Sequence, residues 1–378
     1  MAPSAQDVFS DLPAGLRDRL LMTVSCPDCD DLPKVADAGR CFDSPEGSYQ
    51  VMHNGVKVRD GCYQGAWMSR LIARLRGHHE PQEEKAFHTI LPLIRKGGTM
   101  IEMGAFWAYY SLWFNHQVPG ARNLVLEPDP NRLEVARGNF ALNRRTATFL
   151  QARAGARSVE AVDHFCDSDR VVRQVPQRCI DDLVREEGIG FLDLLHADIQ
   201  GAEVSLLEGL REVIRQKGVR FVFLSTHHHR ISGDPLSHQK CRRFLAEHGA
   251  HVLAEHTVAE SFSGDGLIVA SFADEDRALP VIPLTYNRPS RSLFGEVEYD
   301  LAGAQEQILK ARKLVRQIHQ ALHPGPVGPA AATLEEDLRA LEQDCRAAAR
   351  PIRAFAGKVV RRCRSALVRL SGRRQEAA

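Results

Sequence analysis

The fold is decided by one stretch of the sequence, Asp193-Leu-Leu-His-Ala-Asp-Ile-Gln-Gly-Ala-Glu-Val-Ser-Leu-Leu-Glu-Gly209. Its apolar start predicts a buried strand that ends at Asp198, and the residues after it predict a turn at Gly201. The following segment has the spacing of an amphipathic helix, which Gly209 and, later, Gly218 close. A buried strand joined by a short turn to a helix is a building block of α/β sheets, so similar units are expected on both sides.

This pattern of strands and helices does recur along the middle of the chain. Short apolar runs predict strands at Thr99–Met103, Asn123–Leu126, Ala147–Leu150, Phe191–His196, Arg220–Leu224, His251–Ala254 and Gly266–Ala270. Helical patterns lie at Tyr109–Gln117, Asn131–Leu142, Glu203–Arg215 and Ser237–His248. Such alternation implies βαβ units with right-handed crossovers, so the sequence predicts a doubly wound, mostly parallel α/β sheet. The gap from Gln151 to Gly190 has to hold an insertion or an additional strand and helix.

The chain divides into five zones around this sheet. They are an irregular N-terminal cap at 1–85, the sheet at 86–272, a loop and helix extension at 273–322, a Pro/Gly linker at 323–330 and a basic amphipathic helical tail at 331–378. Within the cap, helical periodicity is present only near Trp67–Leu75. The breaker His323-Pro-Gly-Pro-Val-Gly-Pro329 marks the linker.

Composition limits the class of protein. With 378 residues, 44% of them hydrophobic and 26% charged, the chain has the composition of a globular protein. A formal net charge of +1 argues against a general nucleic-acid binder. No apolar run approaches the ~20 residues that span a bilayer, and the first twenty residues lack a signal-peptide pattern, so we expect a cytoplasmic protein.

The cysteines predict free thiols, and metal binding by Cys26 and Cys29 stays an open alternative. Nine cysteines is an odd number, and they are dispersed over the chain, as is typical of reduced thiols. Cys26-Pro-Asp-Cys29 does have the spacing of zinc ligands. A zinc knuckle, however, needs a second close pair, which the sequence lacks.

The first motif that carries chemistry is Met100-Ile-Glu-Met-Gly-Ala-Phe-Trp-Ala-Tyr-Tyr-Ser111. A strand ends near Glu102, and a helix begins near Tyr109. In an open α/β sheet, ligands bind at the carboxyl ends of the strands. Gly104 has no Cβ and would let the backbone approach a ligand closely. The alternative interpretation is a plain strand–turn–helix without a ligand.

The second motif, Val125-Leu-Glu-Pro-Asp-Pro130, indicates a ribose. A carboxylate at the end of the second strand, here Glu127, accepts hydrogen bonds from ribose hydroxyls, while Asp129 fits the N-cap of the next helix. A dinucleotide would need the pattern G-x-G-x-x-G, whose second and third glycines are missing here. Phe106 and Trp107 would also block a phosphate. S-Adenosylmethionine has a ribose and no phosphate, so it fits better, with Glu102 accepting from its ammonium group.

At this point four ordered motifs resemble the FkbM-type methyltransferase family. Asp193–Gly209 resembles the hallmark segment of the family, and Met100–Ser111 resembles its first motif. Glu127-Pro-Asp-Pro130 with Asn139 and Asn143 resembles the second motif, and Arg178-Cys-Ile-Asp-Asp-Leu183 the approach to the hallmark strand. The resemblance covers roughly residues 86–272. The sequence departs from the family at Glu102, Phe106 and Ala108, where Asp, Asn and Gly are usual.

The resemblance implies a class I S-adenosylmethionine-dependent methyltransferase with a seven-stranded, Rossmann-like sheet. It implies O-methyl transfer to a hydroxyl of a sugar or glycan precursor or of a secondary metabolite. The cofactor-binding residues predicted from the motifs and this resemblance are Glu102, Gly104, Ala105, Phe106, Tyr109, Glu127, Pro128, Asp198 and Gln200. Two rival functions remain open: a nucleotide-sugar or NAD enzyme on a similar sheet, and a non-catalytic methyltransferase-like module in a glycan assembly.

Three histidines, His227 to His229, follow the predicted strand Arg220–Leu224 and face the same crevice as Asp198. Methylation of an alcohol requires a proton acceptor, so His227, His228 and Asp198 are the predicted catalytic residues, with His227 favoured as the base. The open alternatives are a divalent metal held by Asp198 and the histidines, and a solvated polar loop. Asp265 fits acceptor binding, but the Gly264-Asp265-Gly266 sequence favours a simple turn.

Two further segments have alternative interpretations. His78–Glu84 predicts either a lid over the cofactor or a helix start at Pro81, and the helix start is favoured. In the tail, 351–378 carries eight Lys or Arg and one Glu among apolar residues at helical spacing. Such a segment suits an anionic membrane surface, here the inner face of the membrane, or a helix that packs on the enzyme or on a second copy of it.

Overall fold

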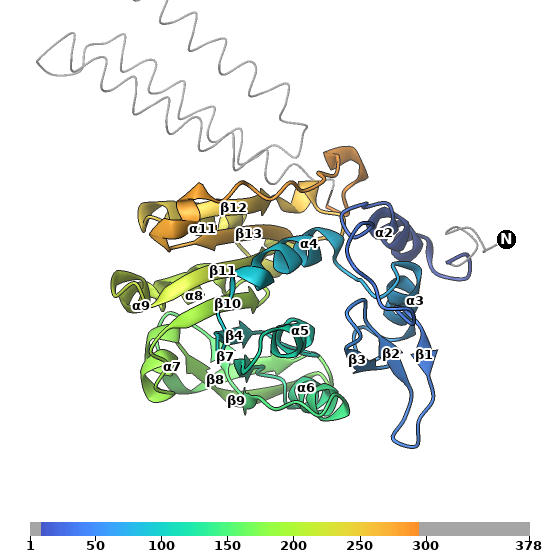
Figure 1. The fold of residues 1–378 in the computed structure, drawn as a ribbon, viewed down its shortest axis with the longest axis horizontal. Coiled ribbons are helices and arrows are strands. Elements are labelled where there is room, and N and C mark those ends of the chain that lie inside the picture. Colours follow the sequence, from blue (N-terminus) through green and yellow to red (C-terminus); the bar gives the residue numbers. More distant parts are fainter. Residues whose placement is uncertain (1–8, 295–378) are drawn as a thin grey trace, which may run out of the picture. The chain divides into compact units, whose positions relative to one another are not determined.

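The computed structural model describes residues 9–294. In them, seven strands form one sheet in the order β12-β13-β11-β10-β4-β5-β6 (Figure 1). The strands are β4 (Thr99–Met103), β5 (Arg122–Leu126), β6 (Thr148–Leu150), β10 (Leu192–Asp198), β11 (Val219–Thr226), β12 (His251–His256) and β13 (Gly266–Ser271). β13 runs antiparallel to both of its neighbours, and the other pairs are parallel. The predicted doubly wound α/β sheet is confirmed.

Alternate residues of the buried strands feed two separate cores, one on each face of the sheet. Met100, Val125 and Leu194 belong to the core under α4 (Pro81–Ile90), α5 (Tyr109–Gln117) and α6 (Pro130–Leu142). Their neighbours Ile101, Leu124 and Leu195 belong to the core under α7 (Ile180–Glu186), α8 (Glu203–Glu208), α9 (Arg211–Arg215) and α11 (Ser237–Glu247). Burial on both faces explains why the strands are continuous apolar runs rather than alternating ones.

The predicted single helix at Glu203–Arg215 is wrong, because the structure divides it into α8 and α9 around Gly209. A Cβ at Gly209 would lie 2.6 Å from the carbonyl oxygen of Gly155 and 2.7 Å from Cβ of Cys179. The turn therefore packs directly on the insertion that follows β6. That insertion is a second sheet of order β7-β9-β8, followed by α7. Its strands are β7 (Arg153–Ala154), β8 (Val159–Cys166) and β9 (Val171–Arg178).

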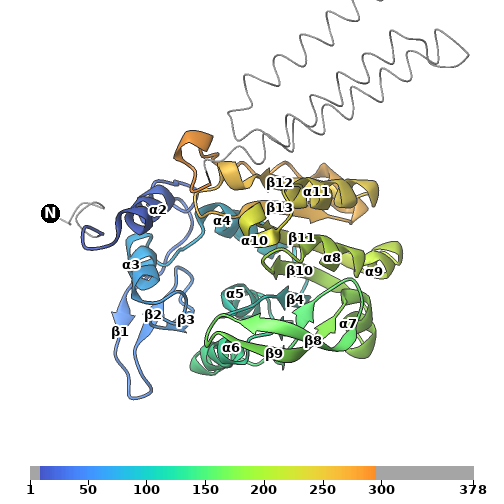
Figure 2. The same cartoon turned by 180° about the vertical axis from the view of Figure 1, so that it is seen from behind.

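The N-terminal region has more regular structure than its composition suggested. It contains α2 (Ala14–Val24), α3 (Ala66–Arg74) and an antiparallel sheet of β1 (Cys41–Phe42), β2 (Tyr49–Val51) and β3 (Lys57–Arg59) (Figure 2). Two side-chain amides, Asn139 of α6 and its C-cap Asn143, dock this sheet. Oδ1 of Asn143 accepts from the Lys57 N–H at 2.9 Å, and Oδ1 of Asn139 accepts from the Arg59 N–H at 2.9 Å. The boundary predicted at 85/86 falls inside α4, and the described residues belong to one compact unit.

Several predictions concern residues outside those described. The helix expected after residue 300, the Pro/Gly linker at 323–330 and the basic tail at 331–378 all lie there. Among the helices of residues 9–294, none has the length and apolar character needed to cross a membrane.

Register places three chain segments at one edge of the central sheet. Met103 pairs with Leu126 on one side and with Ala197 on the other. The residues that follow each of them are Gly104, Glu127 and Asp198, which therefore lie side by side. The chain leaves β4 toward β5 and β6 and returns to β10, so β4 and β10 flank the topological switch point, where open α/β sheets bind ligands.

Gly104 is required by packing inside the protein. The sequence suggested that its missing Cβ makes room for a ligand. In the structure, a Cβ there would lie 1.9 Å from the backbone oxygen of Asp198, and φ of Gly104 is +75°. The turn after β4 thus presses directly on the end of β10, and this contact fixes the floor of the crevice.

Gly104→Ala should lower the free energy of unfolding by about 3 kcal/mol or more, because left-handed strain and overpacking add. Gly97→Ala is the matched control: φ is also +75°, but nothing lies within 4 Å of the added Cβ. The control should lose only about 1–2 kcal/mol of left-handed strain. Urea denaturation measures both values. Equal losses in the two variants would show that the contact with Asp198 is not tight.

Candidate active site

A cavity of about 500 Å³ opens at the carboxyl ends of β4, β5 and β10. Its volume lies in the range of small-molecule sites. Eight of the predicted site residues line it: Glu102, Gly104, Ala105, Phe106, Glu127, Pro128, Asp198 and Gln200. Tyr109 does not, because its side chain lies in the core and its hydroxyl is 3.2 Å from Nδ1 of His53. Sequence reasoning thus located the cavity from residues on three separate strands.

Glu127 lies at the end of β5 and is buried. Its Oε2 accepts from the Phe106 N–H at 2.9 Å, and its Oε1 accepts from the Asp129 N–H at 3.0 Å. Burial raises the pKa of Glu127 to about 7, against the effect of these two donors. Each carboxylate oxygen keeps acceptor capacity toward the cavity, so the ionised form is suited to hold a vicinal diol.

Glu102 stabilises the start of α5. Its Oε2 accepts from the Ser111 N–H at 3.0 Å, and burial raises its pKa above the usual value. The two departures from the family pattern in the following loop fall at left-handed positions, with φ of +44° at Phe106 and +55° at Ala108. The family's Asn and Gly tolerate this backbone best. The guanidinium of Arg132 lies 4.4 Å from the centre of the Phe106 ring, which gives this strained loop a stacking partner.

His227 lies among three carboxylates on the acceptor side. Its Nδ1 is 2.7 Å from Oε1 of Glu203, and its Nε2 is 3.0 Å from Oδ1 of Asp198 and 3.6 Å from Oδ1 of Asp265. Register explains the proximity of Asp265: Gly266, the first residue of β13, pairs with Thr226, the last residue of β11. The Gly-Asp-Gly sequence, for which a simple turn was favoured, thus brings Asp265 to His227, and both residues lie next to Asp198 without lining the cavity themselves.

The three carboxylates determine the charge of His227, and His227 in turn affects theirs. Burial would lower the pKa of His227, but Asp265, Asp198 and Glu203 outweigh it and raise that pKa well above its usual value. The surrounding carboxylates therefore favour the protonated form of the ring, which in turn holds them in place. Burial would raise the pKa of Asp198, yet the hydrogen bond with His227 lowers it. Burial raises the pKa of Asp265 to about 7. The role of free base suggested for His227 stays a prediction, and its surroundings favour a positioning role.

His228 is buried and does not line the cavity. Its ring stacks on Phe294 with the centroids 4.3 Å apart, and its Nδ1 lies 3.4 Å from the Arg230 N–H. The divalent metal considered for Asp198 and the histidines gains no support, since the group of side chains in residues 9–294 suited to a metal lies elsewhere.

The N-terminal region supplies one side of the cavity. Tyr63, Gln64, His79 and Glu80 line it. Tyr63 stacks on Trp107 with the ring centroids 4.6 Å apart, and Oε2 of Glu80 accepts from the hydroxyl of Tyr110 at 3.2 Å. The sequence offered His78–Glu84 as a lid or a helix start. α4 does begin at Pro81, and the two residues before it face the cavity.

The first turn of α4 is bonded into the sheet. Oε1 of Glu83 is 2.7 Å from Nε2 of His196 on β10, and its Oε2 accepts from the Ser225 hydroxyl at 2.9 Å. His196 lines the cavity as well, and the inserted hairpin adds His164, Phe165 and Asp167. None of these contacts has a local sequence signal, because each joins residues far apart in the chain.

The segment that contains most of the central sheet also matches one sequence family. Residues 95–252 match the family described as the methyltransferase FkbM domain. No curated protein matches the chain significantly.

Three solved structures are similar to this chain at low sequence identity. One METTL16 MTase domain is 15% identical and aligns over 70% of this chain and 95% of its own, with a TM-score of 0.37. The M. capricolum TrmK structure, solved with S-adenosyl-homocysteine, is 11% identical over 69% and 95%, with a TM-score of 0.34. A putative O-methyltransferase from Klebsiella pneumoniae is 19% identical over 49% and 77%, with a TM-score of 0.31.

Structures with TM-scores this low do not indicate what this protein does. The evidence for its function is the match to the sequence family, together with the sheet order and the cavity. Residues 95–252 therefore match the methyltransferase FkbM domain, and this match supports an S-adenosylmethionine-dependent methyltransferase.

Proposed function

We propose that the protein transfers the methyl group of S-adenosylmethionine to a hydroxyl of a sugar or glycan precursor or of a secondary metabolite. One observation carries the proposal: a single cavity joins Glu127, suited to a ribose, to Asp198, which is held by His227. The cofactor side, at the end of β5, and the acceptor side, at the end of β10, are thus separated by the single strand β4.

The cavity fits the cofactor by the chemistry of its donors and acceptors. Glu127 offers carboxylate lone pairs to ribose hydroxyls, and the carboxylates of Glu102 and Asp198 offer them to an ammonium group. The backbone approach at Gly104 is closed by Asp198, so the glycine pattern of a dinucleotide site is absent in space as well as in sequence. This argues against the rival NAD or nucleotide-sugar enzyme. When bound, S-adenosylmethionine supplies an electrophilic methyl group on a sulfonium.

The protein has to align the acceptor oxygen and take up its proton. The side chain of Asp198 is 36% exposed and lines the cavity, so it can accept the hydrogen bond of a substrate hydroxyl. Protonated His227 holds this carboxylate through its Nε2, which lies 3.0 Å from Oδ1 of Asp198. Asp265, with a pKa of about 7, provides a site near neutrality where the released proton can reside.

The acceptor side combines aromatic faces with carboxylates. Tyr63, Trp107 and Tyr110 present rings, and Glu80 and Asp198 present acceptors. A neutral polyhydroxylated ring suits this combination, because its hydroxyls donate to carboxylates while its apolar faces cover rings. An acceptor with phosphate or carboxylate groups at this position would meet like charges.

Binding of S-adenosylhomocysteine, followed by calorimetry, should weaken about tenfold from pH 8 to pH 6, because Glu127 becomes protonated below its pKa of about 7. Glu127→Gln should bind more weakly by about 1.5–3 kcal/mol at pH 8 and lose this pH dependence. The exposed Glu134→Gln, on the same segment, is the control. Binding that stays constant with pH in the unchanged protein would remove Glu127 from the cofactor site.

His227→Gln should lower kcat by about 10²–10⁴-fold with nearly constant cofactor affinity, because it acts through Asp198 on the acceptor proton. Asp198→Asn should lower kcat by a similar factor and also weaken cofactor binding, because its carboxylate faces the ammonium group of the cofactor as well. Asp265→Asn should lower kcat and remove the acidic limb of the pH–rate profile. Asp43→Asn, on an exposed loop, should leave turnover unchanged.

The assay transfers a deuterated methyl group to a panel of neutral glycans and glycosides, with mass spectrometry locating the label. Full activity in Asp198→Asn and His227→Gln would place the acceptor elsewhere. Tight cofactor binding without transfer to any member of a broad panel would favour the rival non-catalytic module.

The basic tail suggests two kinds of partner for the enzyme, a membrane surface and a second copy of the chain. Its composition supports contact with an anionic membrane surface through 351–378, or association of two copies through the C-terminal helices. Contact with the membrane would bring the enzyme to glycan precursors that are assembled there.

A further inference from the structure

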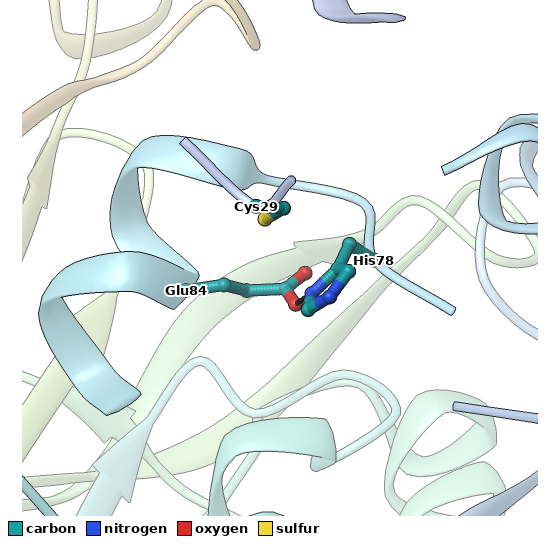
Figure 3. A group of neighbouring side chains, drawn as sticks. All are labelled: Cys29, His78 and Glu84. Carbon is teal, nitrogen blue, oxygen red and sulfur yellow. Dashed lines mark hydrogen bonds and ion pairs between the residues drawn. The ribbon is translucent and has the colours of Figure 1, made fainter. Parts of the chain in front are cut away.

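Outside the cavity, three buried side chains from two segments converge below the start of α4 (Figure 3). Cys29 comes from the loop after α2, His78 precedes α4, and Glu84 lies in its first turn. One donor atom of each lies within 4.8 Å of the donor atoms of the other two. The side chains of His78 and Glu84 are fully buried, and Cys29 is 2% exposed. A sulfur, an imidazole nitrogen and a carboxylate oxygen thus share one enclosed space.

The hydrogen bonds of this group are incomplete. Oε1 of Glu84 accepts from the His79 N–H at 2.7 Å and lies 2.7 Å from Nδ1 of His79, while Oε2 contacts Nδ1 of His78. Nε2 of His78 is buried and has no hydrogen-bond partner. Native proteins rarely leave a buried polar atom unpaired, and a bound ion is one of the ordinary reasons when they do.

The donor set selects the kind of ion. Thiolate sulfur and imidazole nitrogen suit zinc and similar transition metals, whereas calcium and magnesium prefer oxygen alone. Zinc bonds of about 2.0–2.3 Å place tetrahedral ligands roughly 3.3–3.6 Å apart, so the present spacing needs a closure of about 1 Å. Nδ1 of His53 lies 3.8 Å from Oε2 of Glu84 and could become a fourth donor if it gave up its contact of 3.2 Å with the Tyr109 hydroxyl.

We propose that Cys29, His78 and Glu84 bind one zinc-type divalent ion. The site is enclosed by protein, as structural zinc sites are, and has no opening for a substrate. It joins the N-terminal loop to the first turn of α4, next to His79 and Glu80, which line the cavity. The ion therefore stabilises the N-terminal side of the active site and takes no part in methyl transfer. The proposal does not depend on the proposed function.

The test measures metal directly in the full-length chain, purified without chelators. Elemental analysis should find about one zinc per chain. After removal of zinc, cobalt should bind with a thiolate-to-cobalt charge-transfer band in the near ultraviolet. Cys29→Ser should lose this band, and its zinc affinity should fall by at least about 100-fold, since even outer partners of a metal site change affinity by 10–100-fold.

Cys241→Ser is the matched control, because it removes another buried thiol from α11, outside the cluster. It should keep both the zinc and the cobalt band. If Cys29→Ser does not fold, the unchanged protein still decides: a chelator should release zinc and lower its thermal midpoint. An unchanged protein that contains no metal and gives no cobalt band would overturn the site. So would a Cys29→Ser variant that keeps the band.

Discussion

The bonds that Glu83 and Glu84 make in the first turn of α4 hold the N-terminal region against the sheet. Glu83 reaches His196 on β10 and Ser225 on β11, and Glu84 meets His78 and His79. These are buried charged groups, and removal of one partner from such a pair typically costs about 3–5 kcal/mol. Because Glu80 and Tyr63 line the cavity only while this region stays docked, the active site depends on the same bonds.

The opposite side of the cavity is organised by charge as well. Nδ1 of His227 is hydrogen-bonded to Glu203, and its Nε2 forms an ion pair with Asp198, so the charge and the position of the ring depend on the same neighbours. A fixed imidazolium beside Asp198 keeps that carboxylate ionised and aimed at the cavity. This is electrostatic preorganisation: the groups that meet the acceptor hydroxyl are already oriented before it binds.

The central sheet could be predicted because its evidence is local. Each strand is an apolar run bounded by turn residues, and Glu127 and Asp198 stand at the ends of two of them. The N-terminal wall could not, because Tyr63 and His79 reach the cavity through contacts between distant segments. Gly104 was assigned to ligand approach, but its close neighbour is Asp198. Cys29 showed only half of a zinc pattern, since His78 and Glu84 lie about fifty residues further along the chain.

The central claim is that one cavity, at the switch point between β4 and β10, joins a ribose site to an acceptor site. A crystal structure of the full-length protein with S-adenosylhomocysteine tests it most directly. The account predicts that the ribose hydroxyls bond to Glu127 and that the sulfur faces Asp198, with free space between the sulfur and Tyr63 for an acceptor. Electron density for the ligand away from Glu127, or a sulfur that points away from Asp198, would contradict it.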